Sequence, residues 1–276
     1  MSIKLIVSDI DYTLINGPSL PSERVTSALK RAMAQGIAVV TATGRGLFEA
    51  RHIAEHVGAM TYCICMTGAQ LYDLSREESV FCRILSTNKV RQVVEACRAF
   101  PGVYCQLYCE QSIVTDAHNV AAAVQNEVAT GYLGRVEKEL EVVEDIAKRS
   151  ELANDRGAKF LIIAKDQAQL PPLKEVIMKI PGLSAVFSGS WSLEVMDGSA
   201  NKGTALRDLR KILGVEKEEV LAIGDSENDV AMLEEAGIGV AMGNATAPLL
   251  ARAKHVAPPV WEDGAAVAIE RFALGQ

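Results

Sequence analysis

The stretch Asp9-Ile-Asp11-Tyr-Thr-Leu, residues 9–14, stands near the start of the chain, just after an apolar run at residues 3–7. The run is short and rich in β-branched residues, which is typical of a buried strand. Carboxylates placed just past the end of a strand stabilise a fold poorly but are good metal ligands. The stretch therefore indicates a pair of metal-binding carboxylates just past the end of a first strand.

A second acidic pair, Asp225 and Asp229, lies more than 200 residues further along the chain. It belongs to Gly-Asp-Ser-Glu-Asn-Asp at residues 224–229, which again follows an apolar run, at residues 220–223. If the two pairs meet in space, like charges ~4 Å apart cost roughly 4 kcal/mol per pair at an effective dielectric constant of 20. We therefore expect a divalent cation between them, and phosphate chemistry.

Strand and helix patterns alternate on both sides of the chain's middle. The first third has expected strands at residues 3–7, 37–41 and 61–66, and expected helices at 22–36 and 47–57. The last third has expected helices at residues 202–213 and 230–235, and expected strands at 220–223, 238–241 and 255–257. Apolar strands that alternate with helices form parallel sheets covered on both faces. The sequence thus predicts an α/β fold with a doubly wound parallel-sheet core.

The middle of the chain has a different pattern. Helical and strand-like pieces mix there, and a polar, charge-rich stretch at residues 121–148 reads as helix. We therefore assign residues 1–85 and 191–276 to the catalytic core, and residues 86–190 to an inserted α+β domain.

The bulk composition sets further limits. A chain of 276 residues with 49% hydrophobic and 23% charged residues can bury a full core. A formal charge of −7 provides no positive field for nucleic acid or an anionic membrane. The apolar stretch at the start is too short for a signal sequence, and no run approaches the ~18 apolar residues of a membrane span. We expect a cytoplasmic protein whose six cysteines are free thiols.

Other polar side chains follow expected strands or begin an expected helix. Thr43-Gly44-Arg45 follows the strand at residues 37–41, and Lys202 begins the helix at 202–213. In an open parallel sheet, ligands bind beyond the carboxyl ends of the strands, at the point where strand order reverses. A lysine at a helix start opposes the helix dipole, which favours a functional reason for it. Carboxylates suit Mg²⁺, while a hydroxyl and an ammonium suit phosphoryl oxygens.

Four motifs resemble those of the haloacid dehalogenase (HAD) superfamily, in order and in spacing. They are Asp9-Ile-Asp11-Tyr-Thr-Leu, Thr41-Ala-Thr43-Gly-Arg45, Asn201-Lys202-Gly203 and the stretch at residues 224–229. Ala-Met-Gly-Asn-Ala at residues 241–245 and the large insert before Lys202 resemble the Cof-like sugar-phosphate phosphatase branch. The resemblance implies a Rossmann-like core and makes residues 86–190 a cap domain that determines substrate specificity and closes over the site.

The resemblance also implies roles for individual residues. Asp9 is expected to attack phosphorus and form an aspartyl-phosphate, and Asp11 to protonate the leaving alkoxide and then activate water. The expected metal ligands are Asp9, Asp11 through its backbone carbonyl, and Asp225, with Asp229 supporting the metal site through water. The expected phosphate-binding residues are Thr43, Gly44 and Lys202. Arg45 and Asn244 are candidate substrate contacts, with a surface salt bridge and a plain turn as the respective alternatives.

Two positions depart from the family pattern. Tyr12 stands where the family often has glycine, and either narrows the space beside the leaving group or packs outward. Thr67-Gly68-Ala69 stands where Cof-like chains usually have Asn-Gly-Ala, which weakens any role carried over to that loop.

The sequence therefore predicts a Mg²⁺-dependent phosphatase of small phosphorylated metabolites, with sugar phosphates as the expected class. The alternatives are a phosphomutase or phosphotransferase, a phospho-accepting protein like a signalling receiver, and an inert binding protein on the same scaffold. A receiver is ~120 residues long and has no large insert, and the intact set of site residues argues against an inert scaffold. The substrate and the oligomeric state stay open.

Overall fold

The computed structural model describes residues 2–17, 20–58, 60–124, 127–136, 138–152 and 156–276. The chain divides into two compact units: unit 1 is Met1–Phe81 with Asn201–Gln276, and unit 2 is Cys82–Ala200. Unit 2 is thus an insertion in the chain of unit 1. None of the helices in the described part of the chain combines the length and the hydrophobicity that crossing a bilayer requires.

Unit 1 contains a mostly parallel sheet with strand order β14-β13-β12-β1-β2-β3-β4-β5. Its strands are β1 Leu5–Ser8, β2 Ala38–Ala42, β3 Tyr62–Cys65, β4 Gln70–Asp73, β5 Glu78–Cys82, β12 Val220–Gly224, β13 Ile238–Ala241 and β14 His255–Val256. β1 pairs in parallel with both β2 and β12, whereas β4 runs antiparallel to β3. The chain moves outward from β1 through β2 in one direction and from β12 through β13 in the other. The switch point of strand order therefore lies between β1 and β12.

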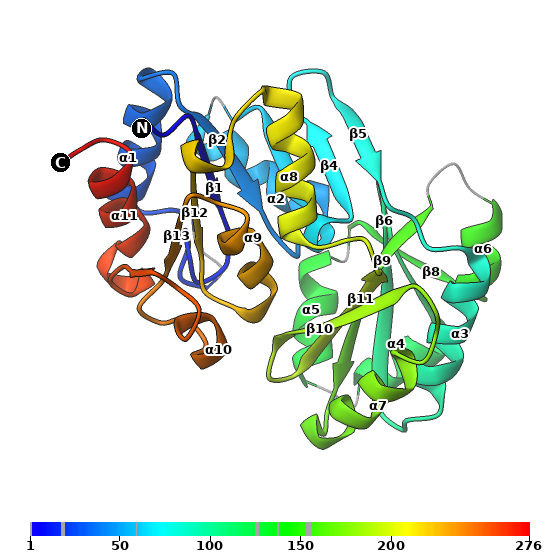
Figure 1. Ribbon diagram of the computed structural model, residues 1–276. Helices are drawn as coiled ribbons and strands as arrows, with labels where there is room; N and C mark the ends of the chain where they lie inside the picture. Colours follow the sequence, from blue (N-terminus) through cyan, green and yellow to red (C-terminus); the bar gives the residue numbers. More distant parts are fainter. Residues whose placement is uncertain (1, 18–19, 59, 125–126, 137, 153–155) are drawn as a thin grey trace. The chain divides into compact units, whose positions relative to one another are not determined.

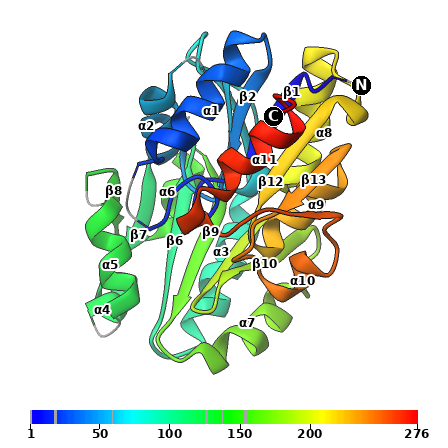
Figure 2. The same cartoon turned by 90° about the vertical axis from the view of Figure 1, so that its left-hand side faces the viewer.

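Helices cover both faces of this sheet. They are α1 Glu23–Ala34, α2 Leu47–Val57, α8 Lys202–Leu213, α9 Val230–Glu234, α10 Ala247–Leu250 and α11 Gly264–Phe272. α1 packs beside α11, and α8 packs beside α9 (Figures 1 and 2). Leu5 and Val7 of β1 share one apolar core with Leu206 of α8 and Met232 of α9. Because successive strand residues face opposite sides, Ile6 faces the other layer and is equally buried. The continuous apolar strands are explained by this double cover.

Unit 2 contains a second sheet, with strand order β10-β11-β9-β6-β7-β8. Its strands are β6 Val103–Cys109, β7 Ile113–Asp116, β8 Leu140–Val143, β9 Gly157–Ala164, β10 Leu183–Gly189 and β11 Ser192–Asp197. Its helices are α3 Thr87–Arg98, α4 Ala117–Val124, α5 Glu127–Val136, α6 Ile146–Leu152 and α7 Leu170–Ile177. One face of the sheet carries an apolar core that includes Leu107, Phe160 and Val195, packed with Val93 of α3 and Leu173 of α7. The α/β class and the presence of an additional α+β domain are thereby confirmed.

Two expectations for the middle of the chain differ from the structure. The stretch at residues 121–148 is not one helical region, because β8 interrupts it and pairs in parallel with β7. The sequence assigns residues 82–85 and 191–200 to the core, but the structure places Cys82–Ala200 in unit 2, where β11 pairs with β9 and β10. Both differences arise from strand pairing, which local periodicity does not reveal.

Candidate active site

The polar residues of the motifs gather at one edge of the unit 1 sheet. Asp9 directly follows β1, Thr43 follows β2 and Asp225 follows β12. These strands are parallel neighbours, so their carboxyl ends lie at the same edge. The backbone N–H of Asp9 donates to the carbonyl of Ile223 at 2.9 Å, which joins the ends of β1 and β12. Asp9 and Asp225 are only 5% and 9% exposed, so their charges need partners within the protein.

Lys202 is the cation that pairs with the buried carboxylates at this edge of the sheet. It is the first residue of α8, and its Nζ lies 2.6 Å from Oδ1 of Asp9 and 2.6 Å from Oδ1 of Asp229. The lysine and Asp229 have no exposed surface. The second oxygen of Asp229 accepts the backbone N–H groups of Asp225 and Ser226, each at 3.0 Å. Asp229 therefore fixes both the lysine and the loop that carries Asp225.

Two glycines allow the backbones to approach this closely. A Cβ at Gly68, where φ is +91°, would lie 2.1 Å from the carbonyl oxygen of Asn201, just before Lys202. A Cβ at Gly224 would lie 2.5 Å from Cγ of Asp229. Larger residues at either position would displace the backbone or the carboxylate. The Thr67-Gly68 loop thus packs against the start of α8 and helps to position Lys202.

Arg45 is paired within the site. Its Nε donates to Oδ2 of Asp11 at 2.8 Å and its Nη2 donates to Oδ1 at 2.6 Å, which makes a two-point contact. Its backbone N–H donates to Oγ1 of Thr43 at 3.1 Å. The side chain of Asp11 is 39% exposed, in contrast to the buried Asp9. Arg45 thus holds the carboxylate of Asp11 in one orientation at a solvent-accessible position.

Asn244 connects two loops. Its Nδ2 donates to the carbonyl of Tyr12 at 2.9 Å, and its Oδ1 accepts the backbone N–H of Val260 at 2.8 Å. Tyr12 adopts a left-handed backbone conformation, with φ of 56°, and it is 54% exposed. Asn244 lies in a turn, and its side chain also reaches the residue that follows Asp11. It holds the turn that follows Asp11.

The charges of the site oppose one another. Burial raises the pKa of Asp9 well above its usual value. Lys202 opposes this rise, while Asp229, Asp225 and Asp11 add to it. Burial, followed by repulsion from Asp229, raises the pKa of Asp225 to about 7. Burial alone would lower the pKa of Lys202, but the charges of Asp229 and Asp9 outweigh it and raise that pKa. With all carboxylates ionised, the cluster is short of positive charge.

The donor set fits a hard divalent cation. Asp9, Asp225 and Asp229 each offer a carboxylate oxygen, and these oxygens lie within 4.8 Å of one another. Mg²⁺ prefers oxygen ligands and is usually held by one or two carboxylates together with substrate phosphate and water. The raised pKa values of Asp9 and Asp225 show the electrostatic conflict that such an ion would relieve. The carboxylate of Asp11 lies outside this group and contacts Arg45 instead.

Sequence reasoning did not find all of these contacts. Thr13 is buried, and its Oγ1 donates to Oδ1 of Asp225 at 3.4 Å, across 212 positions of sequence. The pairing of Arg45 with Asp11 also went unseen, although both residues had been singled out. The available signal was their common position after neighbouring strands.

Comparisons with known proteins agree with this geometry. Residues 6–269 match the family model of haloacid dehalogenase-like hydrolases. A 5-amino-6-(5-phospho-D-ribitylamino)uracil phosphatase of Bacillus subtilis is 30% identical over 276 residues, which cover 99% of this chain and 97% of that protein. A second phosphatase of the same description and organism is 27% identical and covers 99% of each chain.

Solved structures give the same result. A haloacid dehalogenase-like hydrolase from Bacteroides thetaiotaomicron superposes with a TM-score of 0.81 at 29% identity, over 98% of this chain and 99% of that one. Another from Bacillus subtilis has a TM-score of 0.86 at 25% identity, over 98% and 100%. The chain therefore belongs to the haloacid dehalogenase-like hydrolase family, as a Cof-like phosphatase with a Rossmann-like core and an additional domain.

Proposed function

We propose that this enzyme is a Mg²⁺-dependent phosphatase that hydrolyses small phosphorylated metabolites, sugar phosphates foremost, through an aspartyl-phosphate on Asp9. The observation that carries the proposal is the buried group in which Lys202 bridges Asp9 and Asp229 beside Asp225. Nucleophile, cation and metal-binding oxygens are there within a few ångströms of one another. Phosphoryl transfer needs little more than such positioning and charge neutralisation.

Each residue has a distinct part in the proposed reaction. A carboxylate oxygen of Asp9 forms a bond to phosphorus while the bond from phosphorus to the leaving oxygen breaks. Asp11 enters this step protonated, oriented by Arg45, and donates its proton to that leaving oxygen. Asp11 then takes a proton from water, whose oxygen attacks phosphorus and releases phosphate from Asp9.

The remaining residues hold the phosphoryl group and its charge. The hydroxyl oxygen of Thr43 accepts from the backbone of Arg45, which leaves the hydroxyl hydrogen to donate to a phosphoryl oxygen. Lys202 supplies positive charge to the same region. Mg²⁺ held by Asp9, Asp225 and Asp229 would neutralise charge on the phosphoryl oxygens.

The test replaces Asp9 by Asn and measures hydrolysis of p-nitrophenyl phosphate with and without Mg²⁺. Turnover is expected to fall at least ~10³-fold, because the nucleophile is lost. Asp208→Asn, a carboxylate on the surface of α8, is the matched control and is expected to keep full activity. Unchanged turnover in Asp9→Asn would remove Asp9 as nucleophile.

The substrate class rests on separate support. The Bacillus subtilis relatives are described as acting on a pyrimidine that carries a phosphorylated ribityl chain. A screen of phosphorylated sugars, polyols and such ribityl compounds, ranked by kcat/KM, identifies the substrate. Phosphate release that continues over many turnovers supports hydrolysis, whereas transfer of phosphate to a second metabolite would support a phosphomutase.

A further inference from the structure

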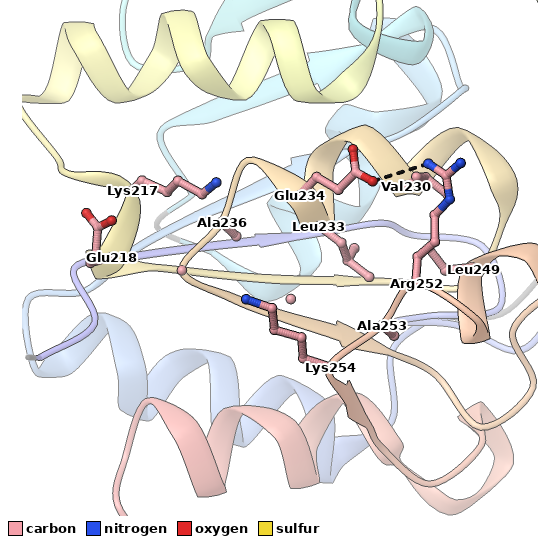
Figure 3. A pocket seen from close by; sticks show the side chains of 12 residues that line it. Lys217, Glu218, Val230, Leu233, Glu234, Ala236, Leu249, Arg252, Ala253 and Lys254 are labelled. Atoms are coloured by element: carbon pink, nitrogen blue, oxygen red, sulfur yellow. Dashed lines mark hydrogen bonds and ion pairs between the residues drawn. The ribbon is translucent and has the colours of Figure 1, made fainter.

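Unit 1 contains a cavity of about 440 Å³ that the proposed reaction does not use (Figure 3). Pockets that hold small molecules have volumes of roughly 300–1,000 Å³. Lys217 and Glu218 precede β12 and Gly237 precedes β13, so this cavity lies toward the amino ends of these strands. Asp225 follows the carboxyl end of β12, and none of the proposed catalytic residues lines the cavity. It is therefore a separate site.

Apolar and polar groups both line this pocket. Leu233 of α9, Ala236 and Leu249 of α10 line it and are buried, and Val230 and Ala253 are partly buried beside them. The apolar part of the lining favours a ligand with a small apolar body, because the transfer of apolar surface from water is worth ~25 cal/mol per Å² buried.

The mouth of the pocket carries positive charge. Glu234 and Arg252 form an exposed ion pair at 3.2 Å, drawn as a dashed line in Figure 3. Lys217 and Lys254 reach the pocket from two different segments (Figure 3), and the ammonium group of neither has an ion-pair or hydrogen-bond partner among the described residues. The only further charge on the lining is Glu218. Two unpaired ammonium groups beside apolar side chains favour an anionic head group, in a chain whose net charge is −7.

The pocket walls connect to the carboxylate loop. Val230 lines the pocket and directly follows Asp229, whose oxygens bind Lys202 and the backbone of the loop. On the other wall, the N–H of Leu249 donates to the carbonyl of Thr246, whose own N–H donates to the carbonyl of Asp225 at 2.8 Å. A ligand that packs between α9 and α10 therefore acts on both ends of residues 225–229.

We propose that this pocket binds a small amphiphilic anion, with its apolar body against Val230 and Leu233 and one anionic head between Lys217 and Lys254. Binding restrains the loop at residues 225–229. The shared chemistry of the ligand is a single carboxylate, sulfonate or phosphate on an apolar body.

The first experiment is a fluorescence titration of the full chain with 8-anilinonaphthalene-1-sulfonate, which has an apolar ring system and one sulfonate. Saturable binding is expected. The double variant Lys217→Gln/Lys254→Gln is expected to weaken it about tenfold or more, because both ammonium groups that pair with the sulfonate are lost. The control Lys30→Gln/Lys211→Gln removes the same charge from exposed lysines outside the pocket and is expected to bind as the wild type does.

Two further arms separate the pocket from its alternatives. Ala253→Phe, which fills the cavity, is expected to abolish binding, whereas Asp9→Asn leaves it unchanged if the probe avoids the catalytic site. Octanoate and 1-octanesulfonate are expected to displace the probe, and octan-1-ol at the same concentration is not. Three results would each overturn the proposal. They are an equal loss of probe affinity in the two double lysine variants, displacement of the probe by octan-1-ol as effective as that by the anions, and loss of probe binding in Asp9→Asn.

The effect on the loop is measured by hydrogen–deuterium exchange of peptides that cover residues 225–229. Saturating probe is expected to slow exchange there in the wild type and in Lys30→Gln/Lys211→Gln, but not in Lys217→Gln/Lys254→Gln. Identical exchange with and without bound probe would overturn the restraint on the loop. This readout depends on neither activity nor bound metal.

Discussion

Replacing Lys202 by Met tests whether one buried ammonium holds the carboxylate cluster together. Methionine has a similar length and fills the same space without the charge. In the wild type, the Nζ atom lies 2.6 Å from an oxygen of Asp9 and 2.6 Å from an oxygen of Asp229, and all three residues are buried. The substitution therefore leaves two buried carboxylates without their common cation.

The magnitude follows from these contacts. At an effective dielectric constant of 20, each contact of 2.6 Å corresponds to an attraction of about 6 kcal/mol, which the cost of burying the ammonium offsets in part. Removing one partner of a buried ion pair costs about 3–5 kcal/mol in measured cases. Because Lys202 serves two carboxylates, we expect Lys202→Met to lower the free energy of unfolding by about 5 kcal/mol.

The assay is urea unfolding followed by circular dichroism, first in EDTA and then with saturating Mg²⁺. Lys211→Met is the matched control, because Lys211 lies on the same helix with a side chain that is 71% exposed and an ion pair at 3.6 Å. The control is expected to stay within ~0.5 kcal/mol of the wild type. Mg²⁺ is expected to reduce the deficit of Lys202→Met, since the ion supplies positive charge to the same oxygens. A Lys202→Met protein within ~0.5 kcal/mol of the wild type in EDTA would refute this reasoning.

Three further outcomes are expected. EDTA should abolish hydrolysis of p-nitrophenyl phosphate and added Mg²⁺ should restore it, which a steady-state assay checks. In unit 2, Lys159 and Glu194 form a buried ion pair at 2.8 Å, so urea unfolding should show Lys159→Met destabilised by about 3–5 kcal/mol and Lys159→Met/Glu194→Leu much less affected. Burial alone would raise the pKa of Asp197, but hydrogen bonds from Ser199 and Lys89 outweigh it and lower that pKa. The stability from Asp197 is therefore present above its unfolded pKa of ~3.9 and lost as the pH falls through the lower folded value. In Asp197→Asn, the urea midpoint of unfolding should therefore fall less steeply as the pH is lowered than it does in the wild type. An equally steep fall in both proteins would contradict this prediction.

Much of the core could be predicted because its signals are local. α8 has the bounds predicted from the sequence, residues 202–213. In the structure, Asn201 caps its start by accepting the N–H of Thr204, and Gly214 ends it in a left-handed conformation. β13 likewise has the expected bounds. In both elements, sequence pattern and tertiary packing favour the same structure.

The elements that the sequence analysis missed are set by strand pairing. β4 and β5 extend the core sheet beyond the parallel strands, and the antiparallel partner of β4 is β3. β8 is a short strand with two exposed residues, so its sequence has little to distinguish it from a polar helix. Strand pairing, rather than propensity, decides such segments.

The active site was likewise predictable in part: the sequence indicated which residues gather, but not how their side chains pair. The rule that ligands bind beyond strand ends predicted that the two acidic pairs meet, and the structure brings Asp9, Asp225 and Asp229 together. The rule did not reveal that Asp11 turns away to Arg45, because which oxygen faces which donor depends on side-chain geometry. The chemical roles of these residues stay predictions.

The central claim is that Asp9 carries the phosphoryl group during turnover. The most direct measurement mixes enzyme, Mg²⁺ and excess substrate, quenches the reaction in acid within a turnover, and analyses peptides by mass spectrometry. We predict that the mass of one phosphoryl group appears on Asp9 in the wild type and on no peptide of Asp9→Asn. A wild-type enzyme that turns over with its phosphoryl group on another residue would contradict the account.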